Sequence, residues 1–518
     1  MELSADFYGV GALVTFVLVL TTWRFLNLVW FKPKKIEKML RDQGLKGNSY
    51  IFMFGDTKEM ARMTREAKSK PVHLNDCIVP RVLPFVHKYV TTHGKMCFVW
   101  MGPKPMVYIT QPAIVREILA NNYQFQRLRK GNPLFKMLTR GLVDVEGDQW
   151  VKHRKIISPA FHIEKFKDMV HAFYVSCNDM MNKWENLLTK ESSCEVDVWP
   201  YLQIMSSDVI SRTAFGSSSE EGRKIFELQE ELVGLIIKSP QSTYILGSRF
   251  LPTKHNKRLK EIDQLVKSLI RNIIDKRVVA MKEGKSSNND LLGTLLKSNY
   301  EEINKEGNKN SGLSIEEIIE ECKLFYFAGQ ETTRALLVWT MILLGQHTNW
   351  QTRAREEVFN VFQDTKPDFE GLNHLKVVNM IFNEVLRLYP PGTSLGRVVH
   401  KQTKLGDLML PAGTLLQINT MLLHYDRDLW GDDVNEFDPN RFSEGVSKAT
   451  KGKTCYVPFG GGPRICIGQN FALMEAKIML VMILQRFCFE ISPSYTHSPH
   501  IVITLQPQFG VPLILHKL

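Results

Sequence analysis

The sequence predicts a mainly α-helical fold with small β-sheets, preceded by one transmembrane helix at its amino terminus. Hydrophobic residues make up 44% of the 518 residues, which is enough to bury a large core. The chain has no internal repeat and no long low-complexity stretch, so wholesale disorder is not expected. Beyond its apolar start, the chain has the pattern of helices with a few short strands, and no abrupt change in composition marks a second folded domain.

The amino-terminal segment is long and apolar enough to cross a bilayer. Residues 7–23 are almost wholly apolar, and the apolar run continues after Arg24 through residues 25–31. Glu2 and Asp6 precede this run, and the basic residues that follow it are Lys32, Lys34, Lys35 and Lys38. The positive-inside rule therefore places the amino terminus in the lumen and the rest of the chain in the cytosol. The alternative, a cleaved signal peptide, needs a basic start and a small-residue cleavage site, and the sequence has neither.

We expect three segments along the chain: a membrane anchor over residues 1–31, a linker or amphipathic approach segment over 32–60, and one folded domain over 61–518. The formal net charge is +12, but the Lys and Arg residues are spread along the chain, so nucleic-acid binding is not expected. The 8 cysteines form no CxxC pair, which argues against a disulfide scaffold or a four-ligand zinc site. A reducing compartment fits this pattern, and most of these thiols are expected to be inert and buried.

A long buried helix is predicted to begin at residue 315. Ser314 and Glu317 have the spacing of a capping box, and the helix should extend to about residue 344. Residues 324–328 in its middle are apolar on all sides, which indicates burial at the centre of a large protein. The alternative is a second membrane span, and charged residues argue against it, namely Glu320, Glu321, Lys323, Glu331 and Arg334.

The strongest motif is a glycine-rich loop that carries one cysteine, FGGGPRICIG over residues 459–468, followed by a helix that should start near Gln469. Such a loop allows close backbone approach to a bound group. At the start of a helix, the thiolate of Cys466 is stabilised by the helix dipole and by free backbone N–H groups, which suits it to ligate a metal. The alternative is a structural glycine turn beside a buried cysteine.

Phe459, Arg464 and Cys466 in this spacing resemble the haem-binding signature of the cytochrome P450 superfamily, and further motifs follow the family's order. Glu384 and Arg387 resemble its ExxR pair, and at i and i+3 on a helix they share a face. Arg441, within FDPNRF, resembles the arginine that completes this ion-pair network in the family. Two positions depart from the pattern. Asn440 replaces the usual acid, which puts one lesser contact in doubt, and Gly461 stands where many relatives have an aromatic residue.

A further segment, AGQETT over residues 328–333, resembles the family's oxygen-activation motif. The Thr332 hydroxyl can reach the Ala328 carbonyl and loosen the helix. Gly329 is expected to leave room beside the cofactor, and Glu331 with Thr332 gives an acid and an alcohol that can relay protons. The alternative is a polar kink in a buried helix.

Residues that would contact the haem propionates come from two other segments. Trp150 and Arg154 resemble the family's WxxxR helix, and Arg397 matches a second propionate-binding position. The alternative is a solvated basic helix. We expect His153 to be a surface or packing residue rather than a ligand.

The resemblance implies the cytochrome P450 fold, a b-type haem with Cys466 as axial ligand of the iron, and monooxygenase activity. NADPH and flavins would act only through a separate NADPH–cytochrome P450 reductase, since the chain has no nucleotide fingerprint; cytochrome b5 is a further implied partner. Six lysines could steer reductase docking, namely Lys152, Lys155, Lys165, Lys167, Lys451 and Lys453. The implied location is the endoplasmic reticulum membrane, with a single span and a cytosolic catalytic domain.

The resemblance is greatest to the plant group that contains secologanin synthase, iridoid hydroxylases, triterpene oxidases and a gibberellin hydroxylase. It implies a small hydrophobic terpenoid as substrate. We expect a triterpenoid of saponin type, with an iridoid or secoiridoid (deoxyloganic acid hydroxylase or secologanin synthase type) or a gibberellin as alternatives. Substrate contacts are expected from residues 121–145, 239–251 and 392–395 and from the long helix. Two alternatives from other classes are a haem-thiolate isomerase or dehydratase and a haem-binding sensor or carrier.

Overall fold

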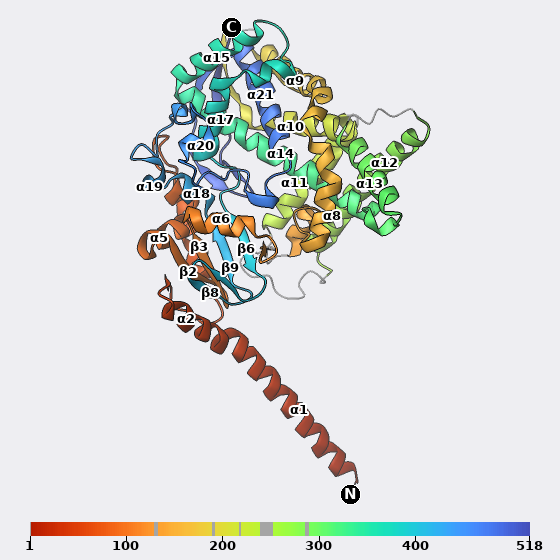
Figure 1. Ribbon diagram of the computed structural model, residues 1–518, viewed down its shortest axis with the longest axis vertical. Helices are drawn as coiled ribbons and strands as arrows, with labels where there is room; N and C mark the ends of the chain where they lie inside the picture. Colours follow the sequence, from red (N-terminus) through yellow and green to blue (C-terminus); the bar gives the residue numbers. More distant parts are fainter. Residues whose placement is uncertain (1, 129–132, 189–191, 217–218, 239–251, 285–289) are drawn as a thin grey trace. The chain divides into compact units, whose positions relative to one another are not determined.

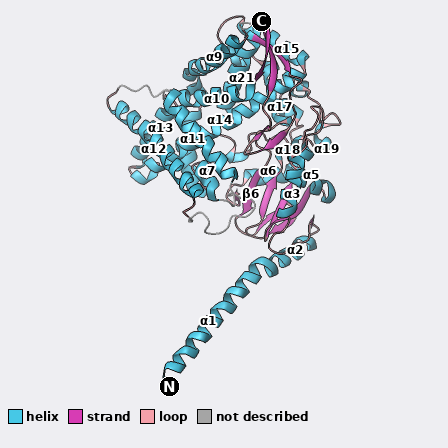
Figure 2. Ribbon diagram, turned by 180° about the vertical axis from the view of Figure 1, so that it is seen from behind, coloured by secondary structure: helices cyan, strands magenta, loops and turns pink. Residues whose placement is uncertain are grey.

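The computed structural model describes residues 2–128, 133–188, 192–216, 219–238, 252–284 and 290–518 (Figures 1 and 2). The fold is mainly helical with small sheets, as predicted. It divides into two compact units, which are described separately. Unit 1 comprises Met1–Ser69, Val79–Leu128 and Ser394–Asn419, and unit 2 comprises Lys70–Ile78, Arg129–Thr393 and Thr420–Leu518.

Unit 1 begins with the predicted membrane segment. Helix α1 (Glu2–Leu26) continues through a short π-helix (Asn27–Phe31) into α2 (Lys32–Asp42), and α1 extends away from the rest of its unit (Figure 1). Within the described residues, one helix is long and apolar enough to cross a membrane. It covers Gly11–Asp42, and its most apolar window is 6% buried. This finding confirms the prediction of a single candidate span at the amino terminus.

The end of the anchor is tied to the folded part of unit 1. In α2, the buried Glu37 pairs with Lys34 at 3.0 Å and with Arg41 at 3.1 Å, and it also accepts a hydrogen bond from the Tyr50 backbone N–H at 3.2 Å. The Tyr50 hydroxyl donates to the carbonyl of Val29 in the π-helix. The backbone that follows Tyr50 is therefore held beside the end of the membrane segment.

A six-stranded sheet forms the rest of unit 1, with the order β1-β2-β3-β9-β6-β4. Strand β3 pairs in parallel with β9, β9 antiparallel with β6, and β6 antiparallel with β4. A separate hairpin joins β7 and β8. The elements of this unit after α2 are β1 (Lys46–Gly47), α3 (Thr57–Lys68), α4 (Val79–Val82), α5 (Pro84–His93), β2 (Met96–Met101), β3 (Lys104–Ile109), α6 (Pro112–Ala120), β4 (Phe125–Arg127), β6 (Leu395–Val399), β7 (Thr403–Leu405), β8 (Leu408–Leu410) and β9 (Leu415–Ile418).

Unit 2 contains most of the helices. In chain order these are α7 (Lys136–Thr139), α8 (Gly147–Ile157), α9 (Val170–Leu187), α10 (Val198–Phe215), α11 (Ser219–Lys238), α12 (Lys254–Lys282), α13 (Leu291–Glu306), α14 (Ile315–Gln346), α15 (Thr348–Phe362), α16 (Phe369–Asn373), α17 (Lys376–Leu388), α18 (Thr420–His424), α19 (Arg427–Trp430), α20 (Val446–Ala449) and α21 (Gln469–Arg486). Its strands are β5 (Ser193–Asp197), β10 (Phe487–Ile491), β11 (Pro499–Ile501), β12 (Leu505–Pro507) and β13 (Pro512–Lys517). They form one three-stranded sheet, β10-β13-β5, and the hairpin β11-β12.

Helix α14 runs through the middle of the helices of unit 2 in both views (Figures 1 and 2). The predicted capping box is present: Ser314 Oγ accepts from the Glu317 N–H at 3.2 Å, and the Glu317 carboxylate accepts from the Ser314 N–H at 2.8 Å. Most of α14 is buried, including Leu324 and Phe327. The capping box and the all-round apolar pattern therefore predicted both the start and the central position of this helix correctly.

Candidate functional site

The cysteine loop lies immediately before α21 in unit 2, and Cys466 is exposed. The backbone N–H of Cys466 donates to the carbonyl of Phe459 at 2.9 Å, which closes the loop. Gly460 and Gly462 have φ of 75° and 65°, a left-handed conformation that strains any residue with a Cβ. The glycines therefore permit a tight loop that presents one thiol at the start of a helix.

Two arginines hold this loop from its two sides. Arg464 lies with its guanidinium 4.7 Å from the ring centroid of Trp150, and it donates to the carboxylate of Glu146 at 2.5 Å. Arg154, one turn after Trp150 on α8, donates to the carbonyl of Ile465 at 3.0 Å. Burial lowers the pKa of Arg154, and the adjacent thiol of Cys466 opposes this effect. Helix α8 thus contacts the two residues that immediately precede the cysteine.

The middle of α14 contains one turn that is not buried. Residues 328–331 are partly exposed and Thr332 is exposed, whereas the helix is buried immediately before and after them. The Thr332 hydroxyl donates to the Ala328 carbonyl at 2.9 Å, the geometry expected from the sequence. An exposed hydroxyl at the centre of a buried helix indicates an internal opening at this turn.

Gly329 has a packing role that the motif did not indicate. A Cβ at this position would lie 2.3 Å from Cδ1 of Ile210 on α10. The glycine therefore permits the close packing of α14 against α10, and room beside a cofactor stays a prediction.

Glu331 is held by two partners that sequence reasoning missed. Its carboxylate accepts from Arg334 at 2.5 Å and from the Thr504 hydroxyl at 2.9 Å. Arg334 in turn lies over the Trp199 ring, 4.2 Å from its centroid. Burial raises the pKa of Glu331, and Arg334 and Thr504 oppose that effect. The i, i+3 spacing of Glu331 and Arg334 could have predicted their pairing. Thr504 lies in the β11–β12 hairpin, far away in sequence, and no local pattern indicates its contact with Glu331.

The ion-pair network lies within unit 2. Arg387 donates to both oxygens of Glu384, from Nε at 2.8 Å and from Nη2 at 2.7 Å, and both side chains are fully buried. Arg441 lies 3.6 Å from Glu384 and pairs with Asp433 at 2.8 Å. Asp433 is thus an acidic partner of Arg441, although the motif has Asn440 next to the arginine.

His424 connects this network to the cysteine loop. Its Nε2 accepts from the Val457 N–H at 3.1 Å, and its Nδ1 donates to the Arg387 carbonyl at 3.0 Å. These two bonds require the neutral ring with the proton on Nδ1. Burial, reinforced by the charge of Arg387, lowers the pKa of His424 to about 3.

The residues of unit 2 fit a metal ion that is already held by a cofactor and takes a single further ligand from the protein. In the described part of the chain, no three His, Cys, Asp or Glu side chains are placed to hold a metal ion by themselves. An exposed thiol at a helix start, flanked by two arginines, suits iron in a porphyrin with carboxylate arms. Arg397, the remaining predicted cofactor residue, lies on β6 in unit 1, where its Nη1 donates to the Gly396 carbonyl. Of the expected substrate contacts, residues 239–251 lie outside the described residues.

Comparisons with known proteins show a family and a fold that the chain resembles. Residues 81–509 match the family described as Cytochrome P450. The chain is 58% identical over 503 residues to Cytochrome P450 CYP72A219 of Panax ginseng, with 97% of both chains covered. It is 51% identical to Secologanin synthase 1 of Catharanthus roseus, with 100% of both covered. The solved structure of retinoic acid-bound cyanobacterial CYP120A1 has a TM-score of 0.75 at 23% identity, covers 92% of this chain and 99% of its own, and supports the fold.

Acid should destabilise the protein in part through His424. In the unfolded chain a histidine has a pKa of about 6.5, so below this pH the unfolded state binds a proton that the folded state excludes. Stability therefore falls as the pH drops from about 6.5 towards the folded pKa of about 3. At pH 5 this contribution is about 2 kcal/mol.

His424→Gln keeps a donor and an acceptor but does not titrate. Thermal unfolding of both proteins in detergent should show a gap in melting temperature that narrows between pH 7 and pH 5. A difference in melting temperature that stays constant from pH 7 to pH 5 would contradict the low pKa of His424 in the folded protein.

Proposed function

Because the chain belongs to the cytochrome P450 family and to its plant CYP72 group, we propose that it hydroxylates or further oxidises a plant terpenoid of the triterpenoid (saponin) class. It is a cytochrome P450 monooxygenase that uses haem and takes electrons from a separate reductase. The observation that carries the proposal is the exposed thiol of Cys466 in its glycine loop, in the same unit as the exposed hydroxyl of Thr332.

The proposed roles of the site residues follow from their chemistry. Cys466 ligates the haem iron, and Phe459 and Arg464 support its loop. When bound, the haem supplies dioxygen binding and O–O bond cleavage, which a thiolate ligand favours. The remaining cofactor contacts are assigned to Trp150, Arg154, Arg397 and Ala328, and the frame of the site to Glu384, Arg387 and Arg441.

Proton delivery is assigned to Thr332 and Glu331. The Thr332 hydroxyl is exposed and donates its one proton to the Ala328 carbonyl; a rotation about its C–O bond turns that proton towards the site, while the oxygen accepts another from solvent. The Glu331 carboxylate is mostly buried and paired with Arg334. We therefore assign it an indirect role: Glu331 passes protons to Thr332, and Arg334 and Thr504 hold its carboxylate in place.

The substrate class rests on the relatives. The 51% identity to a protein named Secologanin synthase 1 over the whole chain supports a terpenoid. Within this class we place a triterpenoid first, because the segments 320–333 and 386–391 resemble the plant group that includes triterpene oxidases. An iridoid or secoiridoid comes second on the strength of the same relative, followed by a gibberellin.

We propose that NADPH–cytochrome P450 reductase docks over the lysines next to the cysteine loop, and that cytochrome b5 is a further partner. Three of the expected lysines are engaged elsewhere: Lys152 donates to the Gly312 carbonyl, Lys155 pairs with Glu302, and Lys167 pairs with Glu164. Lys451 and Lys453 are exposed just before the loop. Lys165 lies on the turn whose Phe166 packs against Phe471 of α21. These three are the better candidates for steering.

We propose the endoplasmic reticulum membrane as the location, with the catalytic domain in the cytosol. The candidate span at the amino terminus supports a membrane anchor. Four consecutive apolar residues, 51–54, are exposed beside the end of this span, where the Phe52 ring lies 5.8 Å from that of Trp30. They add apolar surface that would meet the same membrane.

The proposed function is tested by co-expressing the full chain with a plant reductase in yeast and feeding pentacyclic triterpenoids, iridoid glucosides and gibberellins. We expect NADPH-dependent oxygen uptake and an oxidised triterpenoid, and neither from Cys466→Ala. Oxidation of an iridoid or a gibberellin alone would replace the substrate assignment. Haem binding without oxygen uptake on any member of the panel would favour a sensor, carrier or isomerase.

Thr332→Ala should bind haem normally but uncouple electron use from product formation, because the exposed proton donor is lost. NADPH consumption and hydrogen peroxide should rise relative to product by about tenfold to a hundredfold. Thr340→Ala is a matched control, since Thr340 makes the same bond to Leu336 at 2.8 Å on the same helix but is fully buried. Equal coupling in the two variants would remove Thr332 from proton delivery.

Reversing charge at Lys451 and Lys453 to Glu should raise the reductase concentration needed for half-maximal turnover by about tenfold at low salt. Haem content and the rate with a peroxide oxygen donor should not change. Lys257→Glu with Lys260→Glu, two exposed positions on α12, serves as control. An unchanged reductase dependence would place the docking surface elsewhere.

A further inference from the structure

His153, expected at the surface or in packing, is buried between α8 and α14. Its side chain is 1% exposed, and its Nδ1 lies 2.5 Å from Oε1 of Glu321, which is fully buried. Its Nε2 lies 3.4 Å from Oε1 of Glu317, one turn earlier on the same face of α14. The imidazole is thus held between two carboxylates.

The socket around Glu321 is built for this contact. Gly141 has φ of +103°, and a Cβ there would lie 2.7 Å from Oε2 of Glu321. Burial raises the pKa of Glu321, and the hydrogen bonds from His153 and from the Leu142 backbone oppose this rise. A buried carboxyl group that loses its hydrogen-bond partner destabilises the fold around it.

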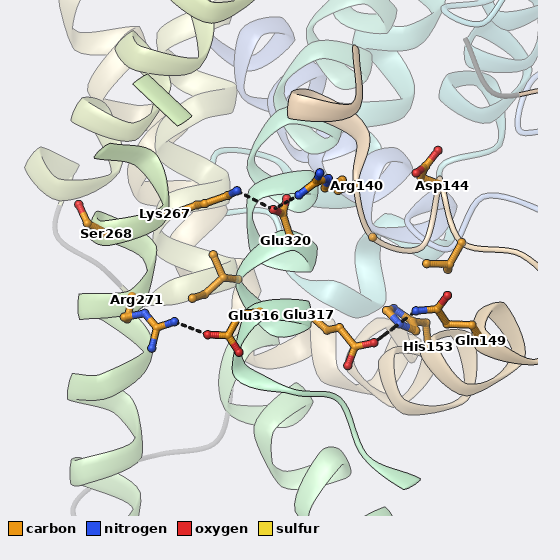
Figure 3. Close-up of a pocket in the computed structure, with 13 residues that line it drawn as sticks. Arg140, Asp144, Gln149, His153, Lys267, Ser268, Arg271, Glu316, Glu317 and Glu320 are labelled. Atoms are coloured by element: carbon orange, nitrogen blue, oxygen red, sulfur yellow. Dashed lines mark hydrogen bonds and ion pairs between the residues drawn. The ribbon is translucent and has the colours of Figure 1, made fainter. Parts of the chain in front are cut away.

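The space beside the pair is a cavity rather than packed side chains. It has a volume of about 580 Å³ and lies between α8, α12 and the start of α14. Figure 3 shows His153 and Gln149 directed towards Glu317 on one side, while Lys267 and Arg271 of α12 pair with Glu320 and Glu316 on the other. Polar contacts therefore contribute to the spacing of α8 and α14 at this point.

Three consecutive residues of α8 make three separate connections. Lys152 donates to the Gly312 carbonyl before α14 at 3.0 Å, His153 bonds to Glu321 within α14, and Arg154 donates to the Ile465 carbonyl beside Cys466 at 3.0 Å. A shift of α8 away from α14 would move Arg154, and with it the loop that carries the thiol.

We propose that His153 is a positioning residue: its bond to Glu321 sets the distance between α8 and α14 and thereby holds Trp150 and Arg154 against the Cys466 loop. This inference rests on the proposed haem site at Cys466. It deepens that site by assigning haem retention to a residue pair that does not touch the cysteine.

The test measures haem loss rather than turnover. In His153→Phe, transfer of haem from the full-length holoprotein to excess apomyoglobin should be about tenfold to a hundredfold faster than in the wild type, by analogy with the loss of supporting contacts at metal sites. The carbon monoxide difference spectrum should show a larger fraction of haem without thiolate ligation. Glu321→Gln keeps an acceptor for Nδ1–H and should behave like the wild type, whereas Glu321→Leu should behave like His153→Phe.

His497→Phe controls for general destabilisation. His497 is also buried and bonded on both ring nitrogens, to Tyr389 and Tyr495, but it does not lie on α8. At a temperature where circular dichroism shows all variants folded, His497→Phe should keep its haem. Wild-type retention in His153→Phe, or equal haem loss in His497→Phe, would overturn the inference. A wild-type chain that takes up no haem would instead overturn the proposed function.

Discussion

The structure of unit 2 depends on the buried guanidinium of Arg387. This side chain is fully buried, and its five N–H donors meet five acceptors: both Glu384 oxygens and the carbonyls of His424, Val434 and Glu436. A buried charge is tolerated when it is paired and all its donors are satisfied. Because three of these acceptors are backbone carbonyls, the arginine fixes the course of a segment that would otherwise have no regular structure.

This constraint extends to the thiol through one histidine. His424 accepts from the Val457 N–H and donates to the Arg387 carbonyl. These two bonds hold the segment before the cysteine loop in a fixed position relative to α17. From the other side, Arg464 and Arg154 tie the loop to α8 and the residues before it. Cys466 thus sits on a loop that is fixed before and beside it, which suits its proposed role as an axial ligand.

Local patterns carried the predictions that held. The capping box at Ser314 fixed the start of α14, and the apolar run after Gln469 gave α21. The i, i+3 spacing of Glu384 and Arg387 placed both on one helical face, where they pair. Partners distant in sequence were missed: Asp433 for Arg441, Glu146 for Arg464 and Thr504 for Glu331. Such contacts depend on how the loops pack against the helices, and no periodic pattern in the sequence indicates which side chains meet.

Gly329 also has a distant partner that the motif did not reveal. The motif predicts that its small size leaves room beside the cofactor, and the structure shows that a Cβ there would meet Ile210 of α10. Close packing there brings α10 to α14, and Trp199 near the start of α10 lies over Arg334, which holds Glu331. The pairing keeps the Glu331 carboxylate on the α10 side of the turn, while the Thr332 hydroxyl is the exposed group. Helix packing, and not the motif alone, therefore leaves the Thr332 hydroxyl exposed and the Glu331 carboxylate paired, and in the proposed function Glu331 acts through Thr332.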